Sequence, residues 1–229
     1  MPQSRFALVV AGGSGSRMGS AIPKQFLCLN GLPVLMHTLN DFFRSPSKPS
    51  LFLVLPSSEH GYWKELCQKH TFTVPHTIVA GGETRFHSVK NGLLAIKGEG
   101  LVAIHDGVRP LITQDLIERC FETARRSGNA VPAVNPVESV RFGQLSESRK
   151  ENRDRVWLAQ TPQVFDLNLI KECYERDWQP DFTDDASVAE ENGHIINLVE
   201  GERENIKITN PLDLIIASAI LEQRQKNNP

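Results

Sequence analysis

Cysteine is scarce in this chain of 229 residues, and the four that occur stand far apart, with no C-x-x-C pair among them. They are Cys28, Cys67, Cys120 and Cys173. Neither a zinc knot nor a disulfide framework is therefore predicted, and the four are expected to be buried small hydrophobic residues. Long apolar runs are missing too. The longest, at 51–55 and 212–220, fall well short of the roughly 20 residues that cross a bilayer, so membrane insertion is not expected.

An excess of charge of one sign is also absent. The chain has 25 basic and 27 acidic residues, a net charge of -2, which gives no broad electrostatic footprint for nucleic acid or for an anionic membrane. A small anionic ligand can still be held by a few well-placed cations. The N-terminus leads straight into a strand pattern without the segments of a secretory signal, so we expect a cytoplasmic protein.

Short apolar runs alternate with amphipathic segments along most of the chain. A hydrophobic content of 40% over this length is enough for a full core, and no segment resembles a linker, so we predict one domain over 1–229. Strands are expected at 6–10, 51–55, 76–79, 101–104, 130–134, 195–200 and 206–208. Helices are expected at 32–43, 62–69, 85–96, 115–126, 166–176, 184–192 and 211–224. This alternation predicts a Rossmann-like α/β fold, a mostly parallel sheet with helices on both faces.

The alternation stops between residues 135 and 156. A short strand-like stretch at 137–142 is followed by a strongly charged one at 146–155. We predict a protruding β-arm at about 135–156, although composition alone is equally compatible with a solvated loop of no consequence.

A glycine-rich loop follows the first predicted strand, in the sequence AGGSGSRM at 11–18. Loops at the carboxyl ends of parallel strands bind ligands, and glycines let backbone N–H groups approach phosphates. The loop is neither the dinucleotide fingerprint, because Met18 stands where the third glycine belongs, nor a P-loop, because no Gly-Lys-Ser/Thr closes it. Arg17 and Lys24 flank the loop with two cations, which favours a polyphosphate ligand.

Six motifs, in order and in register, carry a resemblance to a known family. They are LVVAGGSGSRMGSAIPKQF at 8–26, GGETRFHSV at 81–89, IHDGVRP at 104–110, AQTPQVF at 159–165, TDDAS at 183–187 and EGERENIKIT at 200–209. The first resembles nucleotidyltransferases that activate sugar or polyol phosphates. Together the six resemble the 2-C-methyl-D-erythritol 4-phosphate cytidylyltransferases of the non-mevalonate isoprenoid pathway, and the match spans nearly the whole chain.

The resemblance implies where the nucleotide binds. It assigns CTP, as co-substrate, to the first loop and the cytosine edge to the second motif, with Asp106 and Gly107 nearby. The implied nucleotide residues are Ala11, Gly12, Gly13, Gly15, Gly82, Arg85, Ser88, Asp106 and Gly107. Asp106 ends a predicted strand, where its carboxylate can reach the ribose or a phosphate-bound Mg²⁺. Because Mg²⁺ is held largely by phosphates and water, no all-protein metal cage is expected.

The acceptor side is implied in the same way. The residues matching positions that hold methylerythritol phosphate are Asp106, Arg109, Ser139, Arg153, Thr183 and Lys207. The arm departs from the commonest sequence of the family. It has Glu138-Ser139 where Asp-Thr is frequent, and Asn152 where an aspartate often precedes the arginine, here Arg153. In the family this arm crosses to a second subunit, which implies a homodimer in which Arg153 serves the neighbour's site.

The chemistry implied for these residues needs little acid–base help. A phosphate monoester with a second pKa of about 6 is already mostly dianionic at neutral pH, so its oxygen attacks the α-phosphorus of CTP without a general base. The tasks left to the protein are to position two anions and to stabilise the charge that develops between them. Arg17, Lys24, Arg153 and Lys207 are the candidate catalytic residues.

Two other functions stay open at this point. The first is a cytidylyltransferase for another polyol phosphate such as ribitol 5-phosphate, whose first half would look much the same; the motifs at 183–187 and 200–207 favour the isoprenoid enzyme. The second is a non-catalytic nucleotide-binding module, because fold does not fix function. The presence of all four candidate cations argues against it.

Overall fold

The fold is built on an eight-stranded sheet, seen in a computed structural model that describes residues 3–12 and 22–227. Seven strands follow the order β10-β7-β11-β6-β1-β4-β5, and β12 pairs with β7. Their bounds are β1 Arg5–Val10, β4 Ser50–Leu55, β5 Thr77–Ala80, β6 Leu101–Asp106, β7 Asn129–Val134, β10 Leu158–Ala159, β11 Gln163–Asp166 and β12 Leu198–Glu200. The neighbours β6, β1, β4 and β5 run parallel, which confirms the predicted Rossmann-like α/β fold.

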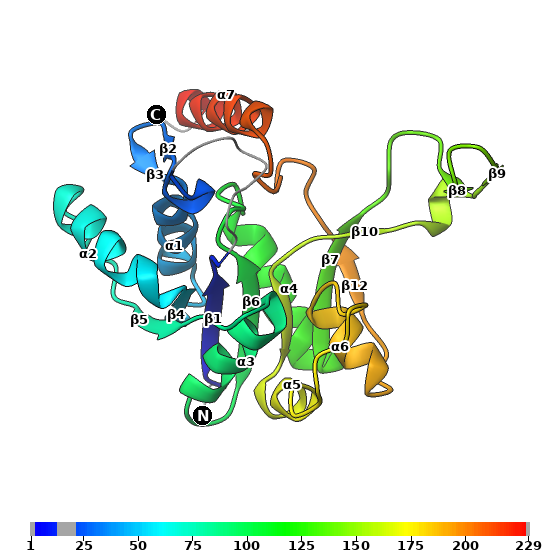
Figure 1. Ribbon diagram of the computed structural model, residues 1–229, viewed down its shortest axis with the longest axis horizontal. Coiled ribbons are helices and arrows are strands. Elements are labelled where there is room, and N and C mark those ends of the chain that lie inside the picture. The colour runs from blue at the N-terminus through cyan, green and yellow to red at the C-terminus, as the bar shows by residue number, and fades with distance from the viewer. Residues whose placement is uncertain (1–2, 13–21, 228–229) are drawn as a thin grey trace.

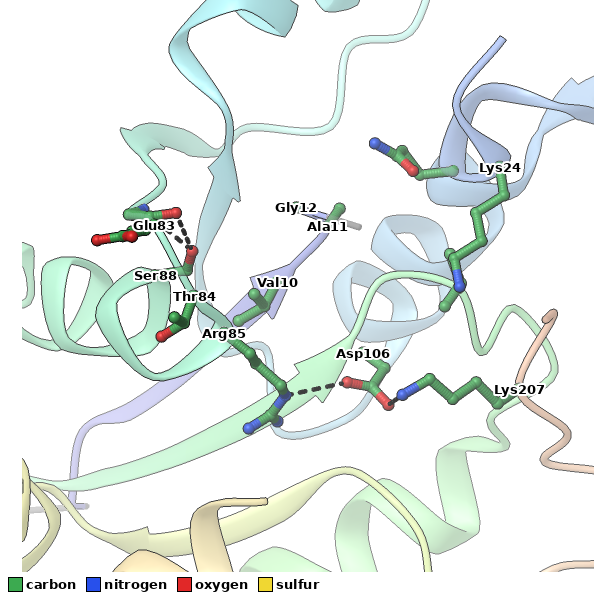
Figure 2. Close-up of a pocket in the computed structure, with 13 residues that line it drawn as sticks. Val10, Ala11, Gly12, Lys24, Glu83, Thr84, Arg85, Ser88, Asp106 and Lys207 are labelled. Atoms are coloured by element: carbon green, nitrogen blue, oxygen red, sulfur yellow. Dashed lines mark hydrogen bonds and ion pairs between the residues drawn. The ribbon is translucent and has the colours of Figure 1, made fainter. Parts of the chain in front are cut away.

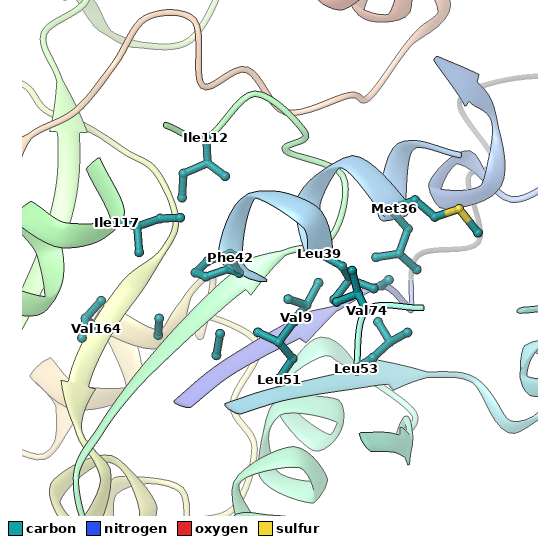
Figure 3. Close-up of a cluster of buried hydrophobic side chains, with 14 of the residues drawn as sticks. Val9, Met36, Leu39, Phe42, Leu51, Leu53, Val74, Ile112, Ile117 and Val164 are labelled. Carbon is teal, nitrogen blue, oxygen red and sulfur yellow. The ribbon is translucent and has the colours of Figure 1, made fainter. Parts of the chain in front are cut away.

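Helices cover both faces of the sheet (Figure 1). Their bounds are α1 Val34–Arg44, α2 His60–Lys69, α3 Arg85–Ala95, α4 Gln114–Ser127, α5 Leu167–Cys173, α6 Asp185–Glu191 and α7 Pro211–Asn227. Successive side chains of a strand point to opposite faces, and β1 supplies both cores. Ala7 and Val9 pack with α1 and α4, whereas Phe6 and Leu8 pack with α3, α5 and α6. The first of these cores is shown in Figure 3.

Helix α7 closes a third, smaller core above the ends of the strands. Its Ala217 packs with Val34 of α1, with Leu111 and with Ile208. The backbone N–H of Ile208 donates to the carbonyl of Val108, in the loop after β6. The segment around Lys207 is thereby fixed beside the end of β6. Among the described residues, no helix combines the length and the apolarity that a membrane span requires.

The expected burial of all four cysteines is wrong, because Cys28 is exposed and Cys67 is only partly buried. Three expectations about local structure are wrong as well. Residues 206–208 form no strand, because this segment lies against the β6 loop and α7 instead of along a sheet edge. Strand β11 was not predicted, and it runs antiparallel between β6 and β7. Its four residues contain only two strongly apolar side chains in sequence, too short a pattern to stand out. Residues 32–33 belong to a small β-hairpin, β2 (Cys28–Leu29) with β3 (Leu32–Pro33), so α1 begins two residues later than predicted.

A hairpin projects from the body at the predicted arm (Figure 1). Its strands are β8 (Arg141–Gly143) and β9 (Ser148–Lys150), paired antiparallel. Residues 137–155 are almost all exposed, including the large apolar side chains of Phe142 and Leu145. Charged and apolar side chains thus lie together on a segment without a core of its own.

The loop after β6 passes very close to the end of β1 at Gly107. A Cβ atom placed on Gly107 would lie 2.9 Å from the Cβ of Ala11 and 3.0 Å from Leu35 Cδ1. The Gly107 N–H donates to the carbonyl of Val10, so the two strand ends are held together by backbone contact. A residue without a side chain is required for this approach.

We predict that Gly107→Ala lowers the free energy of unfolding by about 1–3 kcal/mol, because the added methyl group pushes apart two packed strand ends. Urea denaturation measures the change. The matched control is Gly61→Ala, in α2, where nothing lies within 4 Å of an added Cβ. There the substitution should raise stability by roughly 0.5–1 kcal/mol through helix propensity. Equal effects at both positions would contradict the close approach at Gly107.

Candidate functional site

A hollow of about 200 Å³ opens where β1 and β6 end (Figure 2). Ligands of open α/β sheets bind at this edge, outside the carboxyl ends of parallel strands. We call it the first hollow; it is lined by Val10, Ala11, Gly12, Lys24, Gln25, Gly82, Glu83, Thr84, Arg85, Ser88, Asp106, Val108 and Lys207. Lys24 and Lys207, near opposite ends of the sequence, therefore line one cavity.

One wall of the first hollow is the turn between β5 and α3. Thr84 caps the helix, its hydroxyl oxygen accepting from the N–H of His87. Ser88, which is 4% exposed, accepts a 3.0 Å hydrogen bond from the N–H of Gly82 through its Oγ. A Cβ on Gly82 would collide with His87, so only glycine fits where the chain turns into the helix. The turn is thus held rigidly at the rim of the cavity.

Three cations surround the carboxylate of Asp106, the last residue of β6. Its Oδ2 lies 2.9 Å from Lys207 Nζ and 3.6 Å from Arg109 Nε, and its Oδ1 lies 3.5 Å from Arg85 Nε. Burial favours the neutral acid, but the charges of Arg85, Lys207 and Arg109 outweigh it and hold the pKa of Asp106 well below its usual range. Asp106 is therefore ionised at neutral pH.

Arg85, the first residue of α3, is fixed from its other side by Asp185 of α6. Its Nη1 and Nη2 donate to the two oxygens of that carboxylate at 2.9 and 2.7 Å. Burial opposes the charged guanidinium, yet Asp185 and Asp106 together raise the pKa of Arg85 above its ordinary value. All three nitrogens of the Arg85 guanidinium thus face carboxylates: Nη1 and Nη2 face Asp185, and Nε faces Asp106.

A second hollow, of about 250 Å³, adjoins the first. It is lined by Arg85, Asp106, Arg109, Ala159, Gln160, Thr161, Gln163, Thr183, Asp184 and Lys207. Arg85, Asp106 and Lys207 line both hollows, so the cluster of charges forms the boundary between them. Two ligands bound on either side would meet at this boundary.

Beneath the boundary, His105 is fully buried and fixes the loop after β6. Its Nε2 lies 3.2 Å from the carbonyl of Arg109, which requires a proton on that nitrogen. Its Nδ1 then accepts from the hydroxyl of Thr161 at 3.1 Å, while the Asp106 N–H donates to the same oxygen. Burial lowers the pKa of His105 to about 4. A neutral histidine therefore orients the backbone that carries Asp106 and Arg109.

The residues predicted from sequence fall into five groups. Those in the first hollow are Ala11, Gly12, Lys24, Gly82, Arg85, Ser88, Asp106 and Lys207. Arg109 and Thr183 line the second hollow, and Gly107 lies against Ala11 behind the first. Ser139 and Arg153 lie on the arm, and Arg153 Nη1 donates to the carbonyl of Val137. Gly13, Gly15 and Arg17 lie outside the described residues.

Several lining residues were not predicted. Gln25, Glu83 and Thr84 line the first hollow, and Gln160 and Gln163 the second. Each stands within one of the sequence motifs, so the motifs were a usable signal for location. Asp185, in the motif at 183–187, was missed as the partner of Arg85 because their separation of 100 residues leaves no pattern in sequence.

The fold and the charges define the class of protein. A backbone-lined cavity at the carboxyl ends of parallel strands, with cations converging on its inner end, suits the transfer of a phosphorylated group between two anions. This is the arrangement that a nucleotidyltransferase needs.

The particular family follows from comparison with known proteins. Residues 6–223 match the family model of IspD, 2-C-methyl-D-erythritol 4-phosphate cytidylyltransferase. The chain belongs to this family. It transfers the cytidylyl group from CTP to 2-C-methyl-D-erythritol 4-phosphate, giving 4-diphosphocytidyl-2-C-methyl-D-erythritol and pyrophosphate.

Relatives and solved structures agree over nearly the full length. The enzyme of this name from Bacteroides fragilis is 54% identical over 217 residues, which cover 95% of this chain and 99% of that protein. The one from Porphyromonas gingivalis is 48% identical over 222 residues, covering 96% and 99%. The crystal structure of 4-diphosphocytidyl-2C-methyl-D-erythritol synthase from Anaerococcus prevotii has a TM-score of 0.82 at 30% identity, covering 96% of each chain.

We predict that the free energy of unfolding falls between pH 6.5 and 4 partly through His105. Its pKa of about 4 in the fold lies below the ordinary 6.5, so the unfolded chain takes up the proton first as the pH decreases. The contribution of His105 to the free energy of unfolding is complete above pH 6.5 and is lost as the pH falls towards 4. It amounts to roughly 3 kcal/mol. Urea unfolding across this range should show a flatter pH dependence for His105→Gln. Identical slopes for the two proteins would contradict a buried neutral imidazole.

Proposed function

We propose that the two adjoining hollows hold the two substrates of the cytidylyl transfer, CTP in the first and methylerythritol phosphate in the second. The observation that carries this proposal is the shared boundary of Arg85, Asp106 and Lys207. A reaction between two phosphorylated molecules needs both at one place, with positive charge where they meet.

On the nucleotide side, we propose that the triphosphate lies over Ala11, Gly12, Gly13 and Gly15, because glycines let the backbone come close to phosphate oxygens. The base would lie against Gly82 and Ser88, at the rigid turn before α3. Hydrogen bonds from a fixed turn discriminate among bases, because a wrong base leaves polar groups unpaired. Arg85 belongs to this set at its inner end, where its guanidinium faces Asp106.

On the acceptor side, Arg109, Thr183 and Lys207 would bind methylerythritol phosphate, together with Asp106. Lys207 and Arg109 supply positive charge for the phosphate, and Thr183 supplies a hydroxyl. Both cations face Asp106, which keeps them ordered inside the cavity. Preordered charges stabilise a transition state without reorganising when the reaction occurs.

The proposed chemical step is an in-line displacement at phosphorus. An oxygen of the acceptor phosphate attacks the α-phosphorus of CTP, and pyrophosphate leaves with the electron pair of the broken bond. Because the acceptor is already a dianion, no side chain has to remove a proton. Lys24 and Arg17 would stabilise the charge that develops during the displacement.

Mg²⁺ is part of the proposal as a partner of the triphosphate. Among the described residues, no cluster of three or more histidine, cysteine or carboxylate side chains could hold a metal. A single carboxylate, Asp106, fits an ion that takes most of its ligands from phosphates and water. When bound, the ion would neutralise part of the triphosphate charge.

The arm is proposed to complete the site of a second subunit. Ser139 and Arg153 are predicted to contact the acceptor, yet among the residues that the structure describes neither lines the hollows of its own chain. A homodimer in which each arm reaches the partner's second hollow would reconcile the predicted contact with the observed position of the arm. The exposed Phe142 and Leu145 would be covered by such contacts. In this arrangement, residues 1–229 form one domain with a dimerisation arm.

We predict that Lys24→Ala lowers kcat about 10²–10³-fold, by analogy with the loss of one preorganised donor at a transition state. Pyrophosphate release from CTP and methylerythritol phosphate in the presence of Mg²⁺ measures the effect. Ribitol 5-phosphate, assayed in parallel, tests the acceptor, and little release is expected from it. Near-parental turnover of Lys24→Ala would remove this residue from the chemical step, and faster release with ribitol 5-phosphate would overturn the acceptor assignment.

Mixing two inactive variants tests the arm. We predict that Lys24→Ala and Arg153→Ala each have little activity alone, and that a mixture exchanged into mixed dimers recovers activity. One of the two sites in a mixed dimer then combines an intact Lys24 with an intact Arg153. The control mixes Lys24→Ala with Lys207→Ala, both in the body, where the intact Lys24 and the intact Lys207 never share a site. Recovery in the control, or none in the test, would contradict an arm that acts on the partner.

A further inference from the structure

The Arg85 guanidinium stands between the two hollows, and its direction is set from behind the site. Asp185 takes both Nη groups at 2.9 and 2.7 Å, which fixes the plane of the guanidinium. The remaining nitrogen, Nε, then faces Asp106 at 3.5 Å (Figure 2). The orientation of Arg85 towards Asp106 therefore depends on Asp185, a carboxylate that lines neither hollow.

Asp185 is itself fixed in a buried environment. Its side chain is fully buried, at the start of α6. The preceding Asp184 forms a capping box with Ser187, so the backbone at this point is firmly held. A bidentate pair with a buried carboxylate has little freedom to rotate, unlike an arginine that reaches into solvent.

Tyr174, the residue that follows α5, completes the arrangement. Its hydroxyl donates to Asp185 Oδ1 at 2.6 Å, and its side chain is 2% exposed. Burial and the charge of Asp185 raise the pKa of Tyr174 well above its ordinary value, so the hydroxyl remains a donor. Its ring stacks on Phe86, the residue after Arg85, with centroids 4.6 Å apart. Tyr174 thus holds both the carboxylate and the helix that carries Arg85.

We propose that Asp185 and Tyr174 are positioning residues for the cytidylyl transfer, acting through Arg85 on Asp106. This inference rests on the proposed function of the two hollows. Neither residue touches a substrate; they hold Arg85 so that Asp106 keeps one orientation towards both ligands. A misplacement of about 1 Å in such a group has a large effect on rate.

A purely structural ion pair is the alternative, and it makes different predictions. A buried salt bridge is weak evidence for stability, because well-packed apolar residues can replace it without loss. If Asp185 and Tyr174 served packing alone, removing the tyrosine hydroxyl would lower stability and leave the folded enzyme as active as before.

The decisive variant is Tyr174→Phe, which keeps the ring on Phe86 and removes one hydrogen bond to a charged group. We expect kcat to fall roughly tenfold, because the loss of one hydrogen bond to a charged group corresponds to a rate ratio of about that size. The KM values should change less than about threefold. Asp185→Asn keeps the shape and removes the charge, and its kcat should fall further. Pyrophosphate release gives the kinetics, and circular dichroism establishes that each variant is folded.

A second readout does not depend on turnover. In ¹⁵N NMR spectra of the substrate-free enzyme, the Arg85 Nε–H signal, assigned by its loss in Arg85→Lys, should exchange slowly with water. In Tyr174→Phe it should shift and exchange faster. This signal tests the inference independently of activity. It therefore remains informative even if Lys24→Ala retains activity and the proposed function is wrong.

The matched control is Arg176→Gln, which removes a contact between the turn after α5 and the end of α6. The Arg176 side chain pairs with Glu191 at the end of α6, and among the described residues no hydrogen bond or ion pair joins it to Asp185 or Tyr174. Loss of stability without loss of kcat is expected. An unchanged kcat and Arg85 signal in Tyr174→Phe would overturn the proposal, and so would an equal loss of kcat in Arg176→Gln. Should Asp185→Asn fail to fold, Tyr174→Phe alone decides.

Discussion

The site depends on one buried carboxylate surrounded by positive charge. Asp106 lies within 3.6 Å of Arg85, Arg109 and Lys207, which come from three separate parts of the chain. Three cations brought together without a counter-charge would repel one another and spread apart. The carboxylate allows them to converge in one cavity, because its attraction offsets their mutual repulsion and the cost of burial.

The sheet puts this carboxylate at the meeting point of the cations. Parallel pairing of β6 with β1 brings Asp106 beside Val10, where the glycine-rich loop begins. The close approach at Gly107 and the hydrogen bonds of His105 and Thr161 then fix the loop after β6. Helix α7 holds the segment of Lys207 against the same loop through Ile208. Ordinary packing thus sets the geometry of the charges.

The chemistry suits such a rigid arrangement. A transfer from CTP to a phosphate dianion needs no proton shuttle, so the enzyme's task is to hold two anions and to stabilise the charge between them. The histidine nearest the charges, His105, is accordingly buried with both ring nitrogens hydrogen-bonded. These two hydrogen bonds fix the backbone of the loop that carries Asp106 and Arg109.

The sequence by itself determined the fold class and indicated most of the charged residues that line the two hollows. Alternating apolar runs and helical periodicity are local patterns, and they were enough to place most strands and helices, because burial on two faces imposes them directly on the sequence. The motifs likewise located the residues that line the two hollows, including Lys24, Asp106 and Lys207.

Only the tertiary structure decided which charged side chains pair and which strands run antiparallel to their neighbours. Arg85 and Asp185 are 100 residues apart, and nothing in either local sequence indicates that they meet. Strand β11 has too few residues to show a period, and its antiparallel direction follows from the neighbours that it joins. Pairings of this kind depend on the path of the whole chain through the fold, which local propensity and periodicity do not contain.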